Sequence, residues 1–299
     1  MTAGRLCACV LVAAGLAAVS WPLPGRPAPP ARPLPAAVDA KFVQVSPAPK
    51  DAFTFQRSLG QARVVVLIHG LRLHPFSNDS VNRAAFHDWQ KAGSALVQHL
   101  ARQADVFAFA YSENVPVEQV AETPGLAVNI WRLRQLGYAE VVLVGHSAGG
   151  LVARQFVEDH PGAGVTKVIQ VCSPNGGCAY ARVEAGVRKN QRPFLSSLTK
   201  QARGNFLKAR AGRQIPAAVQ FVCVVGDGAR LGDGVVSNAS QWPADLQFQG
   251  IPAVVLRTTH FTAMRTTAEA ERLADLIRQS QPRWGPAQVA AVRKELWKD

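Results

Sequence analysis

Short runs of consecutive apolar residues recur along the chain and alternate with stretches whose apolar residues have helical spacing. Uninterrupted apolar runs are typical of strands that are buried on both faces of a parallel sheet. We expect strands at residues 63–68, 106–111, 141–144, 165–172, 219–225 and 253–257, and helices at residues 83–103, 117–136 (interrupted near 123–125), 151–158 and 268–279. This alternation predicts the α/β class, with one doubly wound, mostly parallel sheet flanked by helices.

Weaker patterns surround this repeating unit, which we place at residues 41–285. Residues 41–45 and 53–56 suggest two short leading strands, and residues 286–299 suggest a short C-terminal amphipathic helix. Residues 178–215 interrupt the alternation and hold nine basic side chains against the single acid Glu184. Because this insertion follows a strand end, it is predicted to be a helical cap over the edge where ligands bind. A solvated insertion without a role is the alternative.

The N-terminal region has the pattern of a targeting segment. Arg5 precedes an apolar run of signal-peptide length, and small residues end this run near residue 20. Residues 1–20 are therefore expected to be a signal peptide or an uncleaved anchor, which implies export. The proline-rich residues 21–40 are expected to form an extended linker.

The net charge of +13 at pH 7 indicates attraction to anionic surfaces such as lipid headgroups, although a general enrichment in arginine would give the same charge. No nucleic-acid-binding signature accompanies it. Export would leave Cys172, Cys178 and Cys223. The first two are close enough for a disulfide, whereas Cys172 and Cys223 also suit buried strand ends. The spacing of the cysteines does not indicate zinc.

One strand leads into a motif that carries chemistry. Gly145-His146-Ser147-Ala148-Gly149 joins the strand near residue 144 to a helix, and the two glycines permit a tight turn that exposes the Ser147 hydroxyl. Free N–H groups at the start of that helix favour a developing negative charge. The alternative is a phosphate-binding turn, which is disfavoured because a G-x-G-x-x-G motif and a P-loop lysine are missing.

A serine nucleophile needs a histidine base and an acid that orients this base. At a strand–helix elbow both should come later in the chain, each after a strand, with the acid first. Asp227 and Asp233 follow the strand that ends near residue 225, and His260 follows the final strand. His260 is therefore the expected base, and either aspartate satisfies the spacing.

These motifs make residues 63–279 resemble the α/β-hydrolase family, in particular its lipase-like esterases. The resemblance rests on His69-Gly70-Leu71, on the Ser147 elbow, on Asp233-Gly234-Val235-Val236 and on His260, in the order of the family. It implies Ser147 as the nucleophile, His260 as general base and acid, and Asp233 as the orienting acid in preference to Asp227. It also implies an oxyanion hole formed by the N–H groups of Leu71 and Ala148. Arg72 departs from the glycine-rich pattern and points either at an anionic substrate group or into water.

The expected activity is hydrolysis of a carboxylic ester, with a small-molecule or lipid ester as the substrate and no cofactor or metal. An acyltransferase, a thioesterase or an amidase would use the same three residues, because the pocket walls choose the acyl acceptor. A non-catalytic hydrolase-fold binding protein is the alternative from another class. It is disfavoured because the elbow glycines and all three residue types occur together.

Overall fold

The computed structural model describes residues 38–49, 51, 54–74, 77–182, 187–229 and 232–297. The expected leader, residues 21–37 of the expected linker, Phe53 and Glu184 all lie outside these ranges. Within them, no helix combines the length and the apolar character that a membrane span requires.

The described chain forms one seven-stranded sheet with the order β1-β3-β2-β4-β5-β6-β7. Only β1 is antiparallel to its neighbour; the other adjacent pairs are parallel. The strands are β1 (Ala40–Ser46), β2 (Arg63–Ile68), β3 (Asp105–Tyr111), β4 (Glu140–His146), β5 (Lys167–Val171), β6 (Gln220–Gly226) and β7 (Ala253–Leu256). The prediction of a doubly wound, mostly parallel sheet flanked by helices is confirmed.

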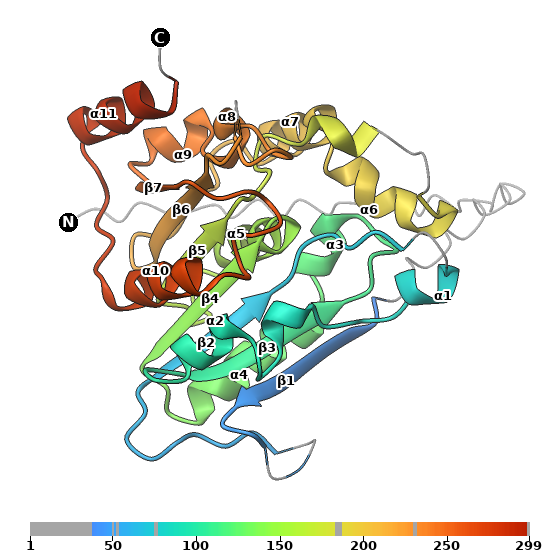
Figure 1. Ribbon diagram of the computed structural model, residues 1–299, viewed down its shortest axis with the longest axis vertical. Coiled ribbons are helices and arrows are strands. Elements are labelled where there is room, and N and C mark those ends of the chain that lie inside the picture. The colour runs from blue at the N-terminus through green and yellow to red at the C-terminus, as the bar shows by residue number, and fades with distance from the viewer. Residues whose placement is uncertain are drawn as a thin grey trace, which may run out of the picture. The chain divides into compact units, whose positions relative to one another are not determined.

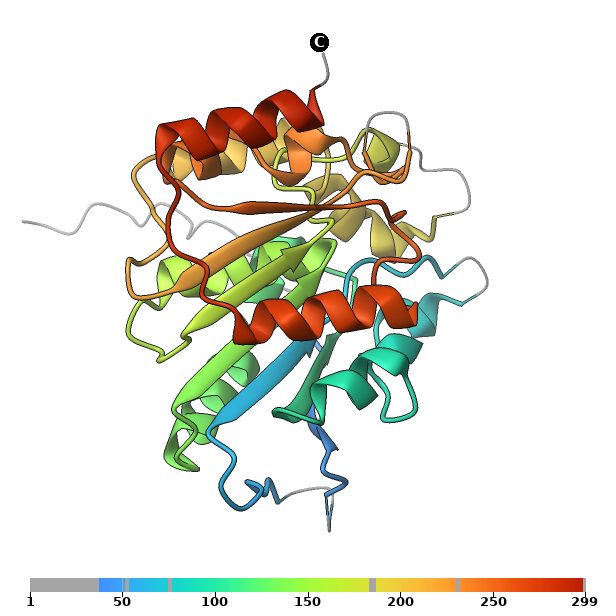
Figure 2. The same ribbon diagram turned by 60° about the vertical axis from the view of Figure 1, so that its left-hand side comes forward.

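Helices cover both faces of the sheet (Figure 1). The α-helices are α1 (Asn78–Val81), α2 (Ala95–Leu100), α3 (Val117–Ala121), α4 (Pro124–Gln135), α5 (Ala148–Asp159), α6 (Arg192–Ser197), α7 (Lys200–Ala209), α8 (Asn238–Gln241), α9 (Ala244–Phe248), α10 (Thr267–Arg278) and α11 (Pro286–Leu296). Short 3₁₀ turns are η1 (Asp88–Gln90), η2 (Ala179–Arg182) and η3 (Lys189–Gln191). Figure 2 shows α10 running across one face of the sheet, where it packs beside α2.

The apolar run of β4 supplies both layers of the core. Val142 and Val144 belong to the layer under α2 and α10, whereas Val141 and Leu143 belong to the layer under α5. All four side chains are fully buried. Burial of each such side chain stabilises the fold by about 1.5–3 kcal/mol, so this strand is fixed in place up to the turn that carries Ser147.

Two expected elements are absent from the described structure. Residues 83–103 do not form one helix, because a turn ends η1 and Ser94 then starts α2 by accepting a hydrogen bond from the Val97 amide at 3.2 Å. Thr54–Gln56 form no strand. The Gln44 side chain instead bonds both the N–H and the C=O of Gln56, at 2.8 and 2.7 Å, and so takes the place of a neighbouring strand.

The basic insertion folds into η2, η3, α6 and α7 between β5 and β6. Its charge is less exposed than the sequence suggests. Arg203, which is only 2 % exposed, pairs with Glu118 of α3, and Arg210 pairs with Glu158 and Asp159 of α5. The acids that pair with these two arginines therefore come from other helices, which a count of charges within the segment misses.

Candidate active site

Ser147 occupies a strained turn between β4 and α5. Its φ of 53° and ψ of −125° lie where side chains are rarely found, a conformation that costs on the order of 1–3 kcal/mol. The Ser147 amide donates to the Val171 carbonyl of β5 at 2.8 Å. A Cβ on Gly145 would collide with the backbone of Gly149, and a Cβ on Gly149 would collide with the backbone of Ile68. The two glycines thus let the elbow lie against the sheet.

His260 lies within hydrogen-bond distance of the serine. Its Nε2 is 3.0 Å from Ser147 Oγ. The His260 amide donates to the Asp233 carbonyl at 2.9 Å, which fixes the loop that follows β7. Ser147 and His260 are 6 % and 8 % exposed, so little water surrounds the pair. This geometry suits transfer of the serine proton to the imidazole.

The acid that reaches His260 is Asp233. Its Oδ2 accepts from His260 Nδ1 at 2.7 Å, and its Oδ1 accepts from the amides of Val235 and Val236 at 2.8 and 2.7 Å. Burial alone would raise the pKa of Asp233, but His260 and the two amides hold this pKa below its usual value. Asp227 instead accepts a bond from Asn238 Nδ2 at 3.1 Å.

Two backbone amides close to Ser147 in the chain or in space are candidates for an oxyanion hole. Gly70 lies so close that a Cβ on it would be 3.1 Å from Ser147 Oγ, so the segment after β2 runs directly past the serine. The N–H groups of Leu71 and Ala148 have no hydrogen-bond acceptor within the described parts of the chain. Ala148 is the first residue of α5, where a helix leaves its amides unpaired.

His69 fixes the peptide group to which the Leu71 amide belongs. Its Nε2 accepts from the Tyr111 amide at 3.1 Å, so its Nδ1 carries the proton and donates to the Gly70 carbonyl at 2.7 Å. Burial lowers the pKa of His69 to about 4, which keeps the ring neutral. The Gly70 carbonyl and the Leu71 N–H are opposite ends of one peptide group, so this bond orients the N–H.

Glu113 and Gln191 fix the next two peptide groups, because the N–H and the C=O of Arg72 belong to successive peptide groups. Glu113 Oε1 accepts from the Arg72 amide at 2.9 Å, while Gln191 Nε2 donates to the Arg72 carbonyl and to Glu113 Oε2, both at 2.6 Å. Burial raises the pKa of Glu113 to about 8. The sequence analysis missed both residues. Glu113 stands just after β3, a position that could have drawn attention, whereas nothing in the sequence singles out Gln191.

His146, the variable residue of the elbow motif, contacts the backbone and the ring of His260. Its Nε2 donates to the His260 carbonyl at 2.9 Å, and the two ring centroids are 4.8 Å apart. Burial lowers the pKa of His146 to about 3, so this second imidazole adds no positive charge beside His260.

The three described cysteines are free and buried. The disulfide alternative for Cys172 and Cys178 is therefore wrong, because Cys178 Sγ donates to the Val235 carbonyl at 3.1 Å instead. His69, His87 and Glu113 also approach one another closely enough to suggest a metal site. Both ring nitrogens of His69 already hold hydrogen bonds, so this cluster offers no lone pair of His69 to an ion.

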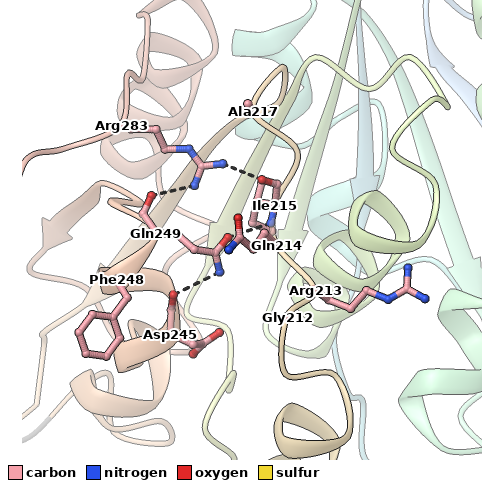
Figure 3. A pocket seen from close by; sticks show the side chains of 9 residues that line it. All are labelled: Gly212, Arg213, Gln214, Ile215, Ala217, Asp245, Phe248, Gln249 and Arg283. Carbon is pink, nitrogen blue, oxygen red and sulfur yellow. Dashed lines mark hydrogen bonds between the residues drawn. The ribbon is translucent and has the colours of Figure 1, made fainter.

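Two cavities lie at opposite ends of the parallel strands. One, of about 510 Å³, lies at the amino ends of β6 and β7. Figure 3 shows that Arg283, which lines it, donates hydrogen bonds to the carbonyls of Gln249 and Ile215. This cavity is remote from the serine, because β6 and β7 run between the two edges of the sheet. The other, of about 480 Å³, includes Arg72 and lies at the edge that carries Ser147.

Comparison with known proteins places the chain in a family. The family description "alpha/beta hydrolase fold" matches residues 63–227, which is more than half of the chain. The chain belongs to the α/β-hydrolase family. A search of curated proteins gave no significant match.

Solved structures share the fold of this α/β hydrolase at low sequence identity. The mature lipase BlEst2 of Bacillus licheniformis is 15% identical, with a TM-score of 0.54 over 82% of this chain and 99% of the lipase. Phospholipase PlaB of Legionella pneumophila is 14% identical, with a TM-score of 0.51 over 78% of this chain and 63% of the phospholipase. At these identities the similarity establishes the fold alone.

Proposed function

We propose that this α/β hydrolase is a serine hydrolase that cleaves carboxylic esters through an acyl-enzyme on Ser147. The observation that carries the proposal is the continuous hydrogen-bonded chain from Ser147 Oγ to His260 at 3.0 Å and from His260 to Asp233 at 2.7 Å. This arrangement of nucleophile, base and orienting acid is what acyl transfer by a serine requires.

In the proposed reaction His260 removes the proton of Ser147 while the oxygen attacks the ester carbonyl. Asp233 holds the imidazole in the required tautomer and stabilises the positive charge that forms on it. The Leu71 and Ala148 amides donate to the oxyanion, and loss of one such donor typically lowers turnover by about 10²–10³. His260 then protonates the leaving alcohol, and water releases the acid by the same route.

The same mechanism serves different acyl acceptors and different acyl chains. An acyltransferase, a thioesterase or an amidase would form the same acyl-enzyme and differ in the group that enters or leaves. A lipase and a phospholipase share the fold, which favours a lipid or other apolar ester as the substrate. The sequence of residues 1–20 supports export of the enzyme.

A fluorophosphonate probe tests whether the site is catalytic. We expect covalent labelling of the wild-type protein and none of Ser147→Ala, with equal thermal unfolding of the two. Absence of labelling on the folded wild-type protein would favour a non-catalytic binding protein. A series of chromogenic esters with increasing acyl length, with an amide and a thioester of the preferred length, then identifies the bond that is cleaved.

A further inference from the structure

The cavity beside Arg72 is rich in positively charged side chains. Its charged and polar lining residues are Lys41, Arg72, His74, Ser77, Ser80 and Arg83, and none of the described residues that line it is a carboxylate. The cations come from three separate parts of the chain, because Lys41 is in β1, Arg72 follows β2 and Arg83 follows α1. The fold therefore brings these cations together from separate parts of the chain.

The cations of this cavity remain available to a ligand. Among the described residues, Lys41 Nζ makes one hydrogen bond, to the Ala84 carbonyl at 3.2 Å, which leaves two of its three protons for a ligand. The guanidinium groups of Arg72 and Arg83 pair with no carboxylate in the described parts of the chain. The nearby acid Asp39 accepts from the Ala84 amide at 2.8 Å and does not line the cavity.

One lining residue of the cavity, Arg72, is next in the chain to the proposed oxyanion hole. Arg72 directly follows Leu71, and Gly70 touches Ser147. Since adjacent α-carbons are about 3.8 Å apart, the α-carbon of Arg72 lies within about 7.6 Å of that of Gly70. The charge of Arg72 also contributes to lowering the pKa of His69 and of His87, after the larger effect of burial, so its field reaches the site.

The orientation of this segment is fixed from within the protein. The Arg72 backbone is held on both sides, by Glu113 at its N–H and by Gln191 at its C=O. Its side chain makes neither of these bonds and lines the cavity. A rigid backbone reduces the loss of conformational freedom when a guanidinium binds an anion, which increases affinity.

We propose that this cavity is a subsite for an anionic group, a phosphate or a carboxylate, that is carried by the ester substrate a few bonds from the scissile carbonyl. The proposal rests on the proposed ester hydrolysis and specifies its substrate class. Arg72 and Arg83 would bind the anion by charge-assisted hydrogen bonds, with Lys41 and the hydroxyls of Ser77 and Ser80 as further donors.

Matched pairs of soluble esters test the subsite. The first pair is the 4-methylumbelliferyl monoester of adipic acid, which carries a free carboxylate, and the neutral hexanoate. The second is dihexanoyl phosphatidic acid and dihexanoylglycerol, both used as monomers. We expect kcat/KM to favour the anionic member of a pair by about tenfold or more, mainly through KM. The two pairs distinguish a carboxylate ester from a phospholipid headgroup.

Three variants identify the residues responsible. Arg72→Gln and Arg83→Gln should each lower the anionic-to-neutral ratio of kcat/KM by about tenfold. Arg102→Gln removes the same charge from an exposed position after α2 and should leave the ratio unchanged. Since only a ratio is compared, a general loss of folded enzyme cancels.

The possible failures are distinct. If neither member of either pair is hydrolysed in a Ser147-dependent way, the proposed ester hydrolysis fails. If the neutral esters are hydrolysed without preference for the anionic ones, or if the three variants change the ratio equally, the subsite is refuted and the cavity has only the general positive charge of the surface.

Discussion

At the scale of single residues, the hydrogen bonds of the candidate site decide which of two aspartates orients His260. Asp227 and Asp233 follow the same strand, and sequence spacing allows either to serve His260. In the structure Asp233 holds His260 through both a side-chain and a backbone bond, whereas Asp227 bonds Asn238. Two main-chain amides also stabilise the charged form of Asp233.

Exchange of each acid for its amide tests this difference. Asp233→Asn should lower kcat by about 10³–10⁴, because an amide cannot hold the required tautomer of His260. Asp227→Asn should lower kcat by less than about threefold and serves as the matched control. Steady-state hydrolysis of one chromogenic ester measures both. Equal losses, or a larger loss for Asp227→Asn, would transfer the role to the other acid.

Glu113 is a positioning residue in our interpretation, because it acts on the Leu71 amide through Arg72. In Glu113→Gln the new NH₂ group would face the donors of Arg72 or Gln191, so one of the two bonds is lost. We expect kcat to fall about tenfold with little change in KM, since the oxyanion contact forms in the transition state. Glu271→Gln, on the exposed face of α10, is the control. A change in KM alone would argue against this role.

Glu113 should also make the stability of the protein depend on pH, and Glu113→Gln is the reference for this effect. Burial raises the pKa of Glu113 from 4.5 to about 8, so between these values the folded protein holds a proton that the unfolded chain has released. Stability from this group therefore falls as pH rises through that window. Relative to Glu113→Gln, the wild-type free energy of unfolding should fall by on the order of 4 kcal/mol between pH 4.5 and 8. Urea titrations would contradict this if the difference stayed constant.

At the scale of elements, the sequence predicts best those strands whose surroundings are apolar on both faces. The apolar runs of β2, β3 and β4 predict these strands without knowledge of their neighbours, because burial on both faces leaves a continuous apolar pattern. The single helix expected at residues 83–103 failed because apolar spacing continues across a turn. Ser94 caps α2 inside that pattern and divides it.

The residues that could not be predicted are those whose role depends on a distant partner. Glu113 and Gln191 are 78 positions apart in sequence and meet only in the folded chain. The same is true of Arg203, whose acid Glu118 is 85 positions away. The nucleophile, base and acid candidates were found because each follows a strand end. Glu113 also follows a strand end, but its role depends on Gln191, which nothing in the sequence singles out.

The role of Lys167 also depends on partners that are distant in sequence, and these partners lie at the end of α10. Its Nζ donates to the carbonyls of Leu276, Ile277 and Gln279, at 3.2, 2.8 and 2.8 Å, and so caps the C-terminus of that helix from β5. Lys167→Met should lower the free energy of unfolding by about 2–3 kcal/mol, because it leaves buried carbonyls without a donor.

Lys91→Met is the control for this capping role, because Lys91 pairs with Asp88 at an exposed site. It should change the free energy of unfolding by less than about 0.5 kcal/mol. Urea unfolding measures both variants, and amide hydrogen exchange locates the effect. An unchanged exchange rate in the last turn of α10 would show that Lys167 does not cap it.

At the scale of the whole molecule, the net charge of +13 implies attraction to anionic membranes, but the structure alters where that attraction should arise. Within residues 178–215, Arg203 and Arg210 are neutralised by acids of α3 and α5. Lys189, Lys200 and Lys208 are exposed and remain candidates for contact with lipid headgroups. We therefore propose that membrane attraction, if it directs the enzyme to lipid esters, depends on these lysines.

Vesicle binding tests this view of the charge distribution. Phosphatidylglycerol vesicles should bind the Ser147→Ala protein, and binding should weaken by about tenfold or more from 50 to 300 mM salt, because salt screens exposed charges. Exchange of both Lys200 and Lys208 for glutamine should weaken binding by about 30-fold, given about 1 kcal/mol for each lysine near the surface. The control, Lys91→Gln with Arg102→Gln, removes the same charge from a different part of the surface.

If this control weakens binding equally, the attraction follows net charge and does not depend on the insertion. If neutral vesicles bind as well as anionic ones at every salt concentration, the attraction is not electrostatic. If the exchange of Lys200 and Lys208 weakens binding more than the control does, the insertion between β5 and β6 is the surface that approaches the membrane. In the sequence this stretch was distinguished only by its arginines and lysines.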